Sequence, residues 1–322
     1  MLLFIHNSNL YQEKYKGFKL IWIHRNSPRG FEDLSLAEMA AAGLKQVSNR
    51  YFCGQSFDIQ KSAYGQFSVR EVSRGLSAKE AIANFNEDIP SPYRMEKFEN
   101  KRRSGSITYA KLAEEIHGGN IRATDPKSII LVFSPDNTIW IAGFVTEKKN
   151  SLVHKLQMLP ERTCVSLTPQ AALALINIAQ TQNPIIDPCC GTGMIPLAAV
   201  LLKKETYASD KNFNMLRMAK ANRDTLGVDL EIQHKDAFSP WISGCCLVSD
   251  FPADRSWSSN IEDLSLKLFM SWIPFIKSFC VIIPSQIIPK LSTAITITKK
   301  IAFTANRTIL LGVIKKADGY TN

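Results

Sequence analysis

The C-terminal half of the chain alternates between short apolar runs and longer segments with apolar residues at helical spacing. Five runs have the length of buried strands: 184–187, 207–210, 230–234, 246–250 and 279–283. Three segments have the helical spacing: 171–179, 195–202 and 213–226. Thr168 and Pro169 stand where an N-cap and a first-turn proline would begin the first of these helices. Strands that alternate with helices in this way predict βαβ units and a parallel sheet.

Two further apolar runs, 295–303 and 308–314, follow the alternating region and predict a terminal antiparallel hairpin. The expected fold of residues 160–322 is therefore α/β and Rossmann-like, with a parallel sheet and the hairpin at its end. Ligands of such sheets bind at the carboxyl ends of the strands.

The N-terminal half has a different pattern, which we interpret as a separate α+β domain over residues 1–150. Strands are expected near 19–24 and 129–133, the latter paired with 138–145 across a Pro-Asp-Asn turn. Helices are expected in three segments: 34–46, 77–85 and 108–117.

Composition narrows the choice of partners and compartment. The 322 residues carry a net charge of +10, spread over both halves, which favours a polyanionic partner. The seven cysteines form no Cys-x-x-Cys pair, so we expect free thiols in a reducing, cytoplasmic compartment and no metal site. The apolar stretch 268–289 is broken by Pro274, Lys277 and Pro284, so no membrane span is expected.

The strongest candidate site is the glycine turn Asp187-Pro-Cys-Cys-Gly-Thr-Gly193, which follows one strand and precedes one helix. Gly191 and Gly193 let the backbone approach a ligand, and the helix N-terminus can meet a carboxylate. Asp210 ends the next strand, where a carboxylate can take both hydroxyls of a ribose. Asp236 follows the third strand, within reach of an adenine amine. The plain alternative, ordinary strand-end caps, explains one such acid better than three.

These motifs lead to a family. Asp-Pro-Cys-Cys-Gly-Thr-Gly-Met-Ile at 187–195, the 209–222 segment with its Met-Ala-Lys-Ala-Asn end, and Lys-Asp-Ala at 235–237 resemble the THUMP-containing RNA methyltransferases, above all the tRNA guanine-N2 methyltransferases. The lead-in at 166–169 and the strand at 306–310 resemble the same family. The resemblance covers roughly residues 160–315. It implies a methyltransferase fold and S-adenosylmethionine (SAM) as the cofactor, bound by these residues: Asp187, Cys189, Gly191, Gly193, Asp210, Asp236 and Ala237.

The family's catalytic strand end is Asp/Asn-Pro-Pro-Tyr/Phe-Gly, and this chain departs from it at 250–254. Asp250 and Pro252 are retained as the expected catalytic residues. A carboxylate and a backbone carbonyl there would accept the N–H groups of a base amine and aim its lone pair. Ala253 replaces the aromatic residue that stacks on the base, and Phe251 or Trp257 are the candidates to supply the ring instead.

The run 92–103 in the N-terminal half interleaves basic and aromatic residues, and Lys101, Arg102 and Arg103 are the candidate RNA contacts. The competing interpretation is a solvated face with ion pairs to Glu96 and Glu99. Residues 123–143 resemble the end of a THUMP domain, which would make this half the RNA-binding domain.

Three functions therefore remain open. The first is methylation of guanine N2 in tRNA or another structured RNA, with guanosine 10 as one target that the resemblance suggests. The second is RNA binding by a catalytically degenerate relative, which the altered strand end favours. The third is N-methylation of DNA or of a protein amide, which also uses Asn/Asp-Pro-Pro-Tyr ends. The resemblance leaves open a small activating subunit, and the sequence does not specify an oligomeric state.

Overall fold

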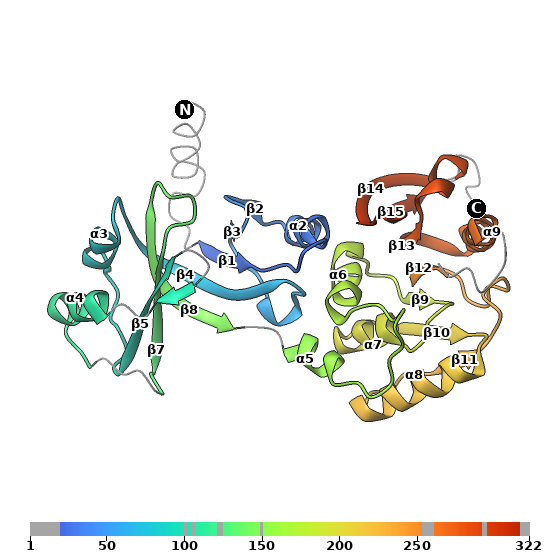
Figure 1. Cartoon of the computed structure of the whole chain (residues 1–322), viewed down its shortest axis with the longest axis horizontal. Helices are drawn as coiled ribbons and strands as arrows, with labels where there is room; N and C mark the ends of the chain where they lie inside the picture. The colour runs from blue at the N-terminus through green and yellow to red at the C-terminus, as the bar shows by residue number, and fades with distance from the viewer. Residues whose placement is uncertain are drawn as a thin grey trace, which may run out of the picture. The chain divides into compact units, whose positions relative to one another are not determined.

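The computed structural model describes residues 20–99, 102–104, 107–120, 125–148, 151–252, 261–291 and 295–315. The chain divides into two compact units (Figure 1). Unit 1 comprises the described residues of Met1–Asn26, Gly43–Gln60 and Gly65–Lys149. Unit 2 comprises those of Ser27–Ala42, Lys61–Tyr64 and Asn150–Asn322. Two short N-terminal segments thus belong to the unit that contains the C-terminal half.

Unit 1 is built on an eight-stranded sheet in the order β2-β3-β1-β4-β8-β7-β5-β6. Its strands are β1 (Ile21–Arg25), β2 (Lys45–Gln46), β3 (Tyr51–Gly54), β4 (Gly65–Gly75), β5 (Tyr93–Glu99), β6 (Arg102–Ser104), β7 (Ser128–Phe133) and β8 (Trp140–Lys148). The β5–β7 pair is parallel and the other neighbouring pairs are antiparallel. The α+β pattern expected for this half is therefore present.

Two helices of unit 1, α3 (Ala78–Ala83) and α4 (Ile107–His117), pack on the sheet through a common apolar cluster. Ser77 begins α3 as its N-cap, because its side-chain oxygen accepts the Glu80 N–H at 3.1 Å. Tyr93 lies in this cluster and is fully buried. Arg94 pairs with Glu96 at 2.8 Å. The Tyr93 ring of the 92–103 run is therefore not open to RNA bases, and this part of the run has the ion pairing of the competing interpretation.

The helix expected over 34–46 is shorter in the structure, where α2 covers Glu32–Ala41. Gly43 follows with φ of +73°, a left-handed conformation that an L side chain rarely adopts and that ends the helix. The chain then enters β2.

Unit 2 contains a seven-stranded sheet in the order β11-β10-β9-β12-β13-β15-β14. Its strands are β9 (Ile185–Asp187), β10 (Thr206–Asp210), β11 (Ile232–His234), β12 (Cys245–Asp250), β13 (Ile276–Pro284), β14 (Ile295–Thr304) and β15 (Arg307–Ile314). The strands from β11 to β13 are parallel, and the β14–β15 hairpin adds to β13 antiparallel. The expected parallel sheet with a terminal hairpin is confirmed.

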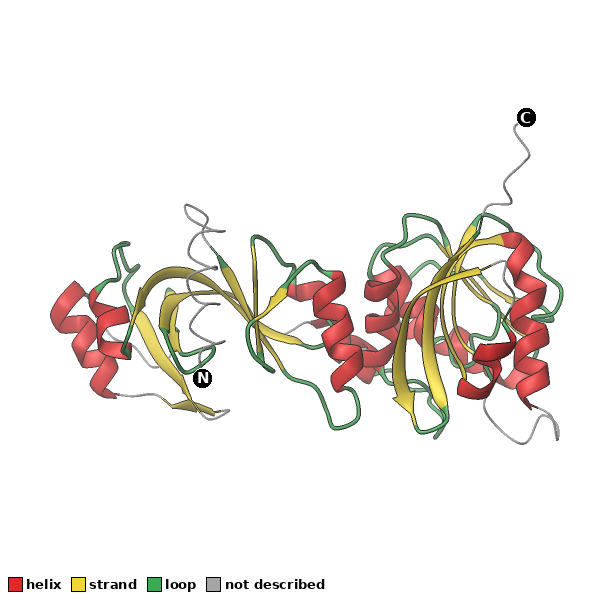
Figure 2. Ribbon diagram, turned by 90° about the horizontal axis from the view of Figure 1, so that it is seen from above, coloured by secondary structure: helices red, strands yellow, loops and turns green. Residues whose placement is uncertain are grey.

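Helices flank this sheet on both faces (Figure 2). The helices of unit 2 are α2, α5 (Ser151–Gln157), α6 (Pro169–Ala179), α7 (Met194–Leu201), α8 (Phe213–Leu226) and α9 (Ile261–Trp272). Short 3₁₀ helices occur at Ile59–Lys61, where the chain passes from unit 1 to unit 2, and at Ile273–Phe275 and Ser285–Lys290 in unit 2. Both faces of the central strands are buried, since Ile185 and Ile186 point to opposite faces and neither is exposed. Among the described helices, none has the length and apolar character that crossing a membrane requires.

Glu38 of α2 fastens two segments of unit 2 to each other. Its buried carboxylate accepts the N–H groups of Ala63 (2.6 Å) and Tyr64 (3.1 Å), the Ser62 hydroxyl (3.2 Å) and the Asn177 side-chain amide of α6 (2.7 Å). Burial raises the pKa of Glu38, and these donors act against that rise. The carboxylate is therefore the shared acceptor for residues 62–64 and for α6.

Replacing this acceptor should destabilise the protein. In Glu38→Gln the new amide turns a donor toward groups that are themselves donors, so the free energy of unfolding should fall by about 1–3 kcal/mol. Urea denaturation measures this. Asp33→Asn, an exposed carboxylate on the same helix, is the control and should change little. Equal effects of the two variants would contradict the role given to Glu38.

Candidate functional site

The glycine turn between β9 and α7 has the left-handed conformations that its sequence predicts. Gly191 has φ of +55° and Gly193, the N-cap of α7, has φ of +87°. A Cβ on Gly193 would also lie 3.3 Å from the Ala219 Cβ of α8, so this position is restricted by both backbone and packing. The turn is closed by the Gly193 N–H, which donates to the Cys190 carbonyl at 2.8 Å.

The polar side chains of Asn222 and Ser166 contact the glycine turn at Thr192. The buried amide of Asn222 in α8 donates to the carbonyls of Thr192 (2.9 Å) and Glu161 (2.8 Å), and its oxygen accepts the Glu161 N–H at 3.0 Å. The Ser166 hydroxyl lies 3.1 Å from that of Thr192. The lead-in before α6 and the end of the 209–222 segment therefore meet at the glycine turn.

Asp187 ends β9 beneath the turn and is 1% exposed. Its Oδ1 accepts the Ser249 hydroxyl at 2.7 Å and the Cys189 N–H at 3.2 Å. Burial raises the pKa of Asp187 to about 7, and the charges of Asp210 and Asp250 add to the rise. Burial, with Asp187 and Asp210 nearby, also raises the pKa of the Cys189 thiol, so this thiol stays protonated at neutral pH.

Asp210 is the last residue of β10, and Asp236 follows the end of β11. Asp210 fixes the turn, because its Oδ2 accepts the Gly191 N–H at 2.9 Å and its Oδ1 accepts the Asn212 N–H at 2.9 Å. A carboxylate has about four acceptor positions, so Asp210 keeps capacity for a ligand. Asp236 is exposed, and its Oδ1 accepts the Phe238 N–H at 3.0 Å.

Asp250, at the end of β12, forms an ion pair with Arg307 of β15, and Arg307 Nη2 lies 2.5 Å from Asp250 Oδ1. The same nitrogen donates to the Phe251 carbonyl (2.6 Å) and the Ile282 carbonyl (3.2 Å). Burial raises the pKa of Asp250, and the Arg307 guanidinium opposes that rise. Arg307 therefore contacts both the Asp250 carboxylate, which was expected to hold a base amine, and a backbone carbonyl of the same strand end.

One cavity of about 650 Å³ joins these strand ends, within the size range of small-molecule sites. It is lined by Val165, Pro188, Cys189, Gly191, Asp210, Lys211, Asn212, Met215, Asp236, Ala237, Phe238, Asp250, Phe251, Pro252, Leu264, Leu268 and Arg307. Eight residues expected from the sequence line it: Cys189, Gly191, Asp210, Asp236, Ala237, Asp250, Phe251 and Pro252. Asp187 and Gly193 are outside the lining and act through the turn.

Phe251 is 1% exposed and meets Phe269 edge-on within the apolar core of unit 2. Its N–H donates to the Ile282 carbonyl of β13 at 3.1 Å, which continues the strand pairing and fixes the direction of the ring. The ring borders the cavity as part of the core, so the expectation that it offers a face to a base is not met in this structure.

Several expected contacts lie outside the described residues. They are Lys101, Trp257 and the altered positions Ala253 and Asp254. The backbones of Arg102 and Arg103 form β6, paired with Glu99 and Phe98 of β5, and the described part of the chain does not include their side chains. Their role in RNA binding stays a prediction. In the described ranges no cluster of three or more His, Cys, Asp or Glu residues is arranged to bind a metal ion.

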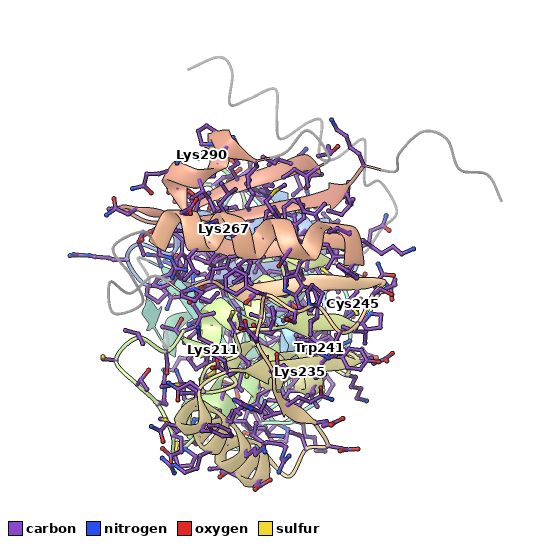
Figure 3. All side chains as sticks on the ribbon, turned by 90° about the vertical axis from the view of Figure 1, so that its right-hand side faces the viewer. Lys211, Lys235, Trp241, Cys245, Lys267 and Lys290 are labelled. Atoms are coloured by element: carbon purple, nitrogen blue, oxygen red, sulfur yellow. The ribbon has the colours of Figure 1, made fainter. Side chains whose placement is uncertain are left out.

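Arg307 is a residue of the candidate site that the sequence did not predict. The sequence places it only in a strand that resembles the family's last one. The signal was a lone basic residue at the start of an otherwise apolar β-strand, Arg307-Thr-Ile-Leu-Leu. Lys211 also lines the cavity, and its label marks that rim of unit 2 in Figure 3.

No family model matches the chain. Among curated proteins it is similar to the tRNA (guanine(10)-N2)-dimethyltransferase of Pyrococcus abyssi, with 28% identity over 117 residues. That match covers 35% of this chain and 35% of the relative, so it spans about a third of the relative's length.

Solved structures match nearly the whole chain. TrmN from Thermus thermophilus superposes with a TM-score of 0.56 at 16% identity, over 92% of this chain and 100% of that one. A predicted N6-adenine-specific DNA methylase from Listeria monocytogenes has a TM-score of 0.50 at 13% identity, over 94% and 98%. SMU.472, described as a methyltransferase and complexed with SAH, has a TM-score of 0.50 at 12% identity, over 94% and 100%. At these identities the likeness shows the fold, and unit 2 has the Rossmann-like α/β methyltransferase fold.

The raised pKa of Asp187 makes stability depend on pH. A carboxyl with a folded-state pKa of about 7 binds more protons folded than unfolded between about pH 4 and 7, so stability falls as pH rises through that range. Asp187→Asn keeps the Oδ1 acceptor and removes the titration. From pH 4 to pH 8 the variant should gain on the order of 4 kcal/mol of unfolding free energy relative to the wild type.

Urea denaturation at each pH tests this prediction. Asp229→Asn, an exposed carboxylate before β11, is the control and should track the wild type. A pH-independent difference between Asp187→Asn and the wild type would show that Asp187 titrates as an ordinary carboxyl.

Proposed function

We propose that this protein is a SAM-dependent methyltransferase that acts on guanine N2 in tRNA. The observation that carries the proposal is that Asp210, Asp236 and Asp250, at the carboxyl ends of three parallel strands, line one cavity next to a glycine turn. The curated relative named as a tRNA guanine-N2 dimethyltransferase, the TrmN structure and the SAH-bound neighbour support the choice of substrate and cofactor.

The residues of the cavity fit SAM. Asp210 retains acceptor capacity for the ribose hydroxyls. Asp236 is exposed, so its carboxylate can accept a hydrogen bond from the adenine amine. Ala237, Phe238 and Met215 give apolar surface for a ring. When bound, SAM supplies an electrophilic methyl group on its sulfonium.

In this proposal Asp250 and the Phe251 carbonyl accept the two N–H groups of the base amine. An exocyclic amine is a weak nucleophile because its lone pair is delocalised into the ring, and acceptors for its N–H groups orient and enrich that lone pair. Arg307 uses one position on each acceptor. A carboxylate has about four such positions and a carbonyl two, so both retain capacity for the amine.

A second candidate function is RNA binding without methyl transfer. It is favoured by the contacts of Arg307, which already engages Asp250 and the Phe251 carbonyl. It is also favoured by Phe251, whose ring is enclosed in the core rather than open to a base. Turnover distinguishes this candidate from the first.

The cofactor assignment is tested on Asp210. Asp210→Ala removes charge-assisted hydrogen bonds worth about 1.5–3 kcal/mol, so calorimetry should show SAM binding weakened by roughly 10- to 150-fold. Because Asp210 also accepts the Gly191 N–H, a thermal melt must accompany the titration. A folded variant with the affinity of the wild type would contradict the assignment.

The reaction is tested on Asp250. Wild type, Asp250→Asn and the exposed control Asp229→Asn are incubated with labelled SAM and unmodified tRNA, followed by nucleoside analysis. Asp250→Asn should bind SAM and tRNA normally but lose methyl transfer by orders of magnitude, because it turns a donor toward the amine. Labelled N2-methylguanosine from wild type and control is the expected product.

Other outcomes separate the alternatives. A wild type that binds tRNA and SAM without turnover establishes the second candidate. Label transferred to DNA or protein and not to tRNA overturns the choice of substrate. An active wild type that is indifferent to Asp250→Asn removes Asp250 from the catalytic machinery.

A further inference from the structure

Two aromatic rings stack on each other at the surface of unit 2, near the ends of β10 and β11. Phe213, the first residue of α8, is 70% exposed, and its ring centroid lies 3.9 Å from that of His234 with an interplanar angle of 25°. The His234 Nε2 lies 3.0 Å from the Lys211 carbonyl oxygen, which fixes the imidazole. The His234 ring therefore covers one side of the Phe213 ring, and most of the Phe213 side chain is open to solvent.

The stacked pair is next to the cavity in the fold. His234 pairs with Asp210 across the parallel β10–β11 ladder, and Asp210 lines the cavity. Phe213 comes three residues after Asp210, and His234 comes two before Asp236, which also lines the cavity. Both rings therefore lie at the carboxyl ends of β10 and β11, the edge of the sheet where the candidate site is.

Lys235 continues this edge, with its Nζ 5.1 Å from the centroid of the Trp241 ring. Figure 3 shows Lys211, Lys235 and Trp241 on one face of unit 2, below the helix α9 that carries Lys267. Lys235 directly follows His234 in the chain and so joins the stacked pair to Trp241, and we call Phe213, His234, Lys235 and Trp241 the stacking edge.

We propose that the stacking edge binds the single-stranded RNA segment next to the nucleotide that enters the cavity, an inference that rests on the proposed function. The open face of Phe213 stacks on an unpaired base, and Lys235 meets a neighbouring phosphate. Proteins that bind single strands combine these two features, because every base has a π-face and every linkage a negative charge.

The chemistry of the edge favours RNA over a protein partner. A protein-docking surface would bury a contiguous apolar patch, whereas here one exposed ring is followed by lysine and tryptophan. The position beside a cavity suited to a base also matches a strand whose target nucleotide is turned out of its stack. Neighbouring unpaired bases then need a stacking partner of their own.

The test measures binding of a fluorescently labelled, unmodified tRNA transcript by anisotropy, in the presence of SAM. Phe213→Ala should weaken binding roughly 5- to 150-fold, the range for one stacked base, and Phe213→Trp should retain it. Lys235→Ala should reduce the slope of log K against log salt by about 0.7, the value for one single-strand phosphate contact. SAM affinity, measured by calorimetry, should stay unchanged in all three.

Phe275→Ala and Lys277→Ala are the matched controls. Both residues are exposed and lie at the amino end of β13, the edge of the sheet opposite the cavity. Tryptic peptides containing Phe213 should also be recovered cross-linked to RNA after ultraviolet irradiation. Equal RNA affinity of Phe213→Ala and Phe275→Ala overturns the inference, as does a wild type that binds no RNA.

The two proposals fail in different ways. A wild type that binds tRNA through the stacking edge and transfers no methyl group keeps the inference and overturns the catalytic part of the proposed function. An active wild type whose RNA binding ignores Phe213→Ala and Lys235→Ala overturns the inference alone.

Discussion

Several carboxylates lie close together at the edge of the unit 2 sheet where its parallel strands end. Burial and the charges of the neighbouring carboxylates disfavour the ionised form of each, so each needs donors that stabilise it. Asp187 receives a backbone N–H and a hydroxyl, Asp210 two backbone N–H groups, and Asp250 the guanidinium of Arg307. The Gly191 N–H that stabilises Asp210 also shapes the glycine turn. The same contacts therefore shape the cavity and stabilise its charged groups.

The cavity by itself does not choose a substrate. Its acidic strand ends and glycine turn suit a cofactor and an amine, and a similar fold occurs in a protein named as a predicted DNA methylase. Selection among polymers then depends on surfaces outside the cavity. In unit 2 that surface includes the exposed ring of Phe213 and Lys235. These side chains select a nucleic-acid strand by its flexibility and charge and not by the identity of its bases.

The sequence predicted unit 2 well because its signals are local. Thr168 caps α6 as expected, and α8 covers the expected residues and ends at Gly227, whose φ is +62°. Local signals fail for β4, the longest strand of unit 1, because its arginines and glutamates look solvated until pairs such as Arg70–Glu87 form. The contact of Arg307 with the site joins residues far apart in the chain, and no periodicity reports it.

The helix α2 gives the order of synthesis a physical consequence. Asn177, which bonds to Glu38, is synthesised long after it, so the Glu38 carboxylate and the apolar side of α2 lack their α6 partners while the strands of unit 1 are synthesised. A fragment that starts at Ser151 would lack the helix that covers α6 and would expose an apolar surface. We therefore expect the C-terminal half to aggregate when it is expressed alone, and a fragment designed to fold by itself has to include α2.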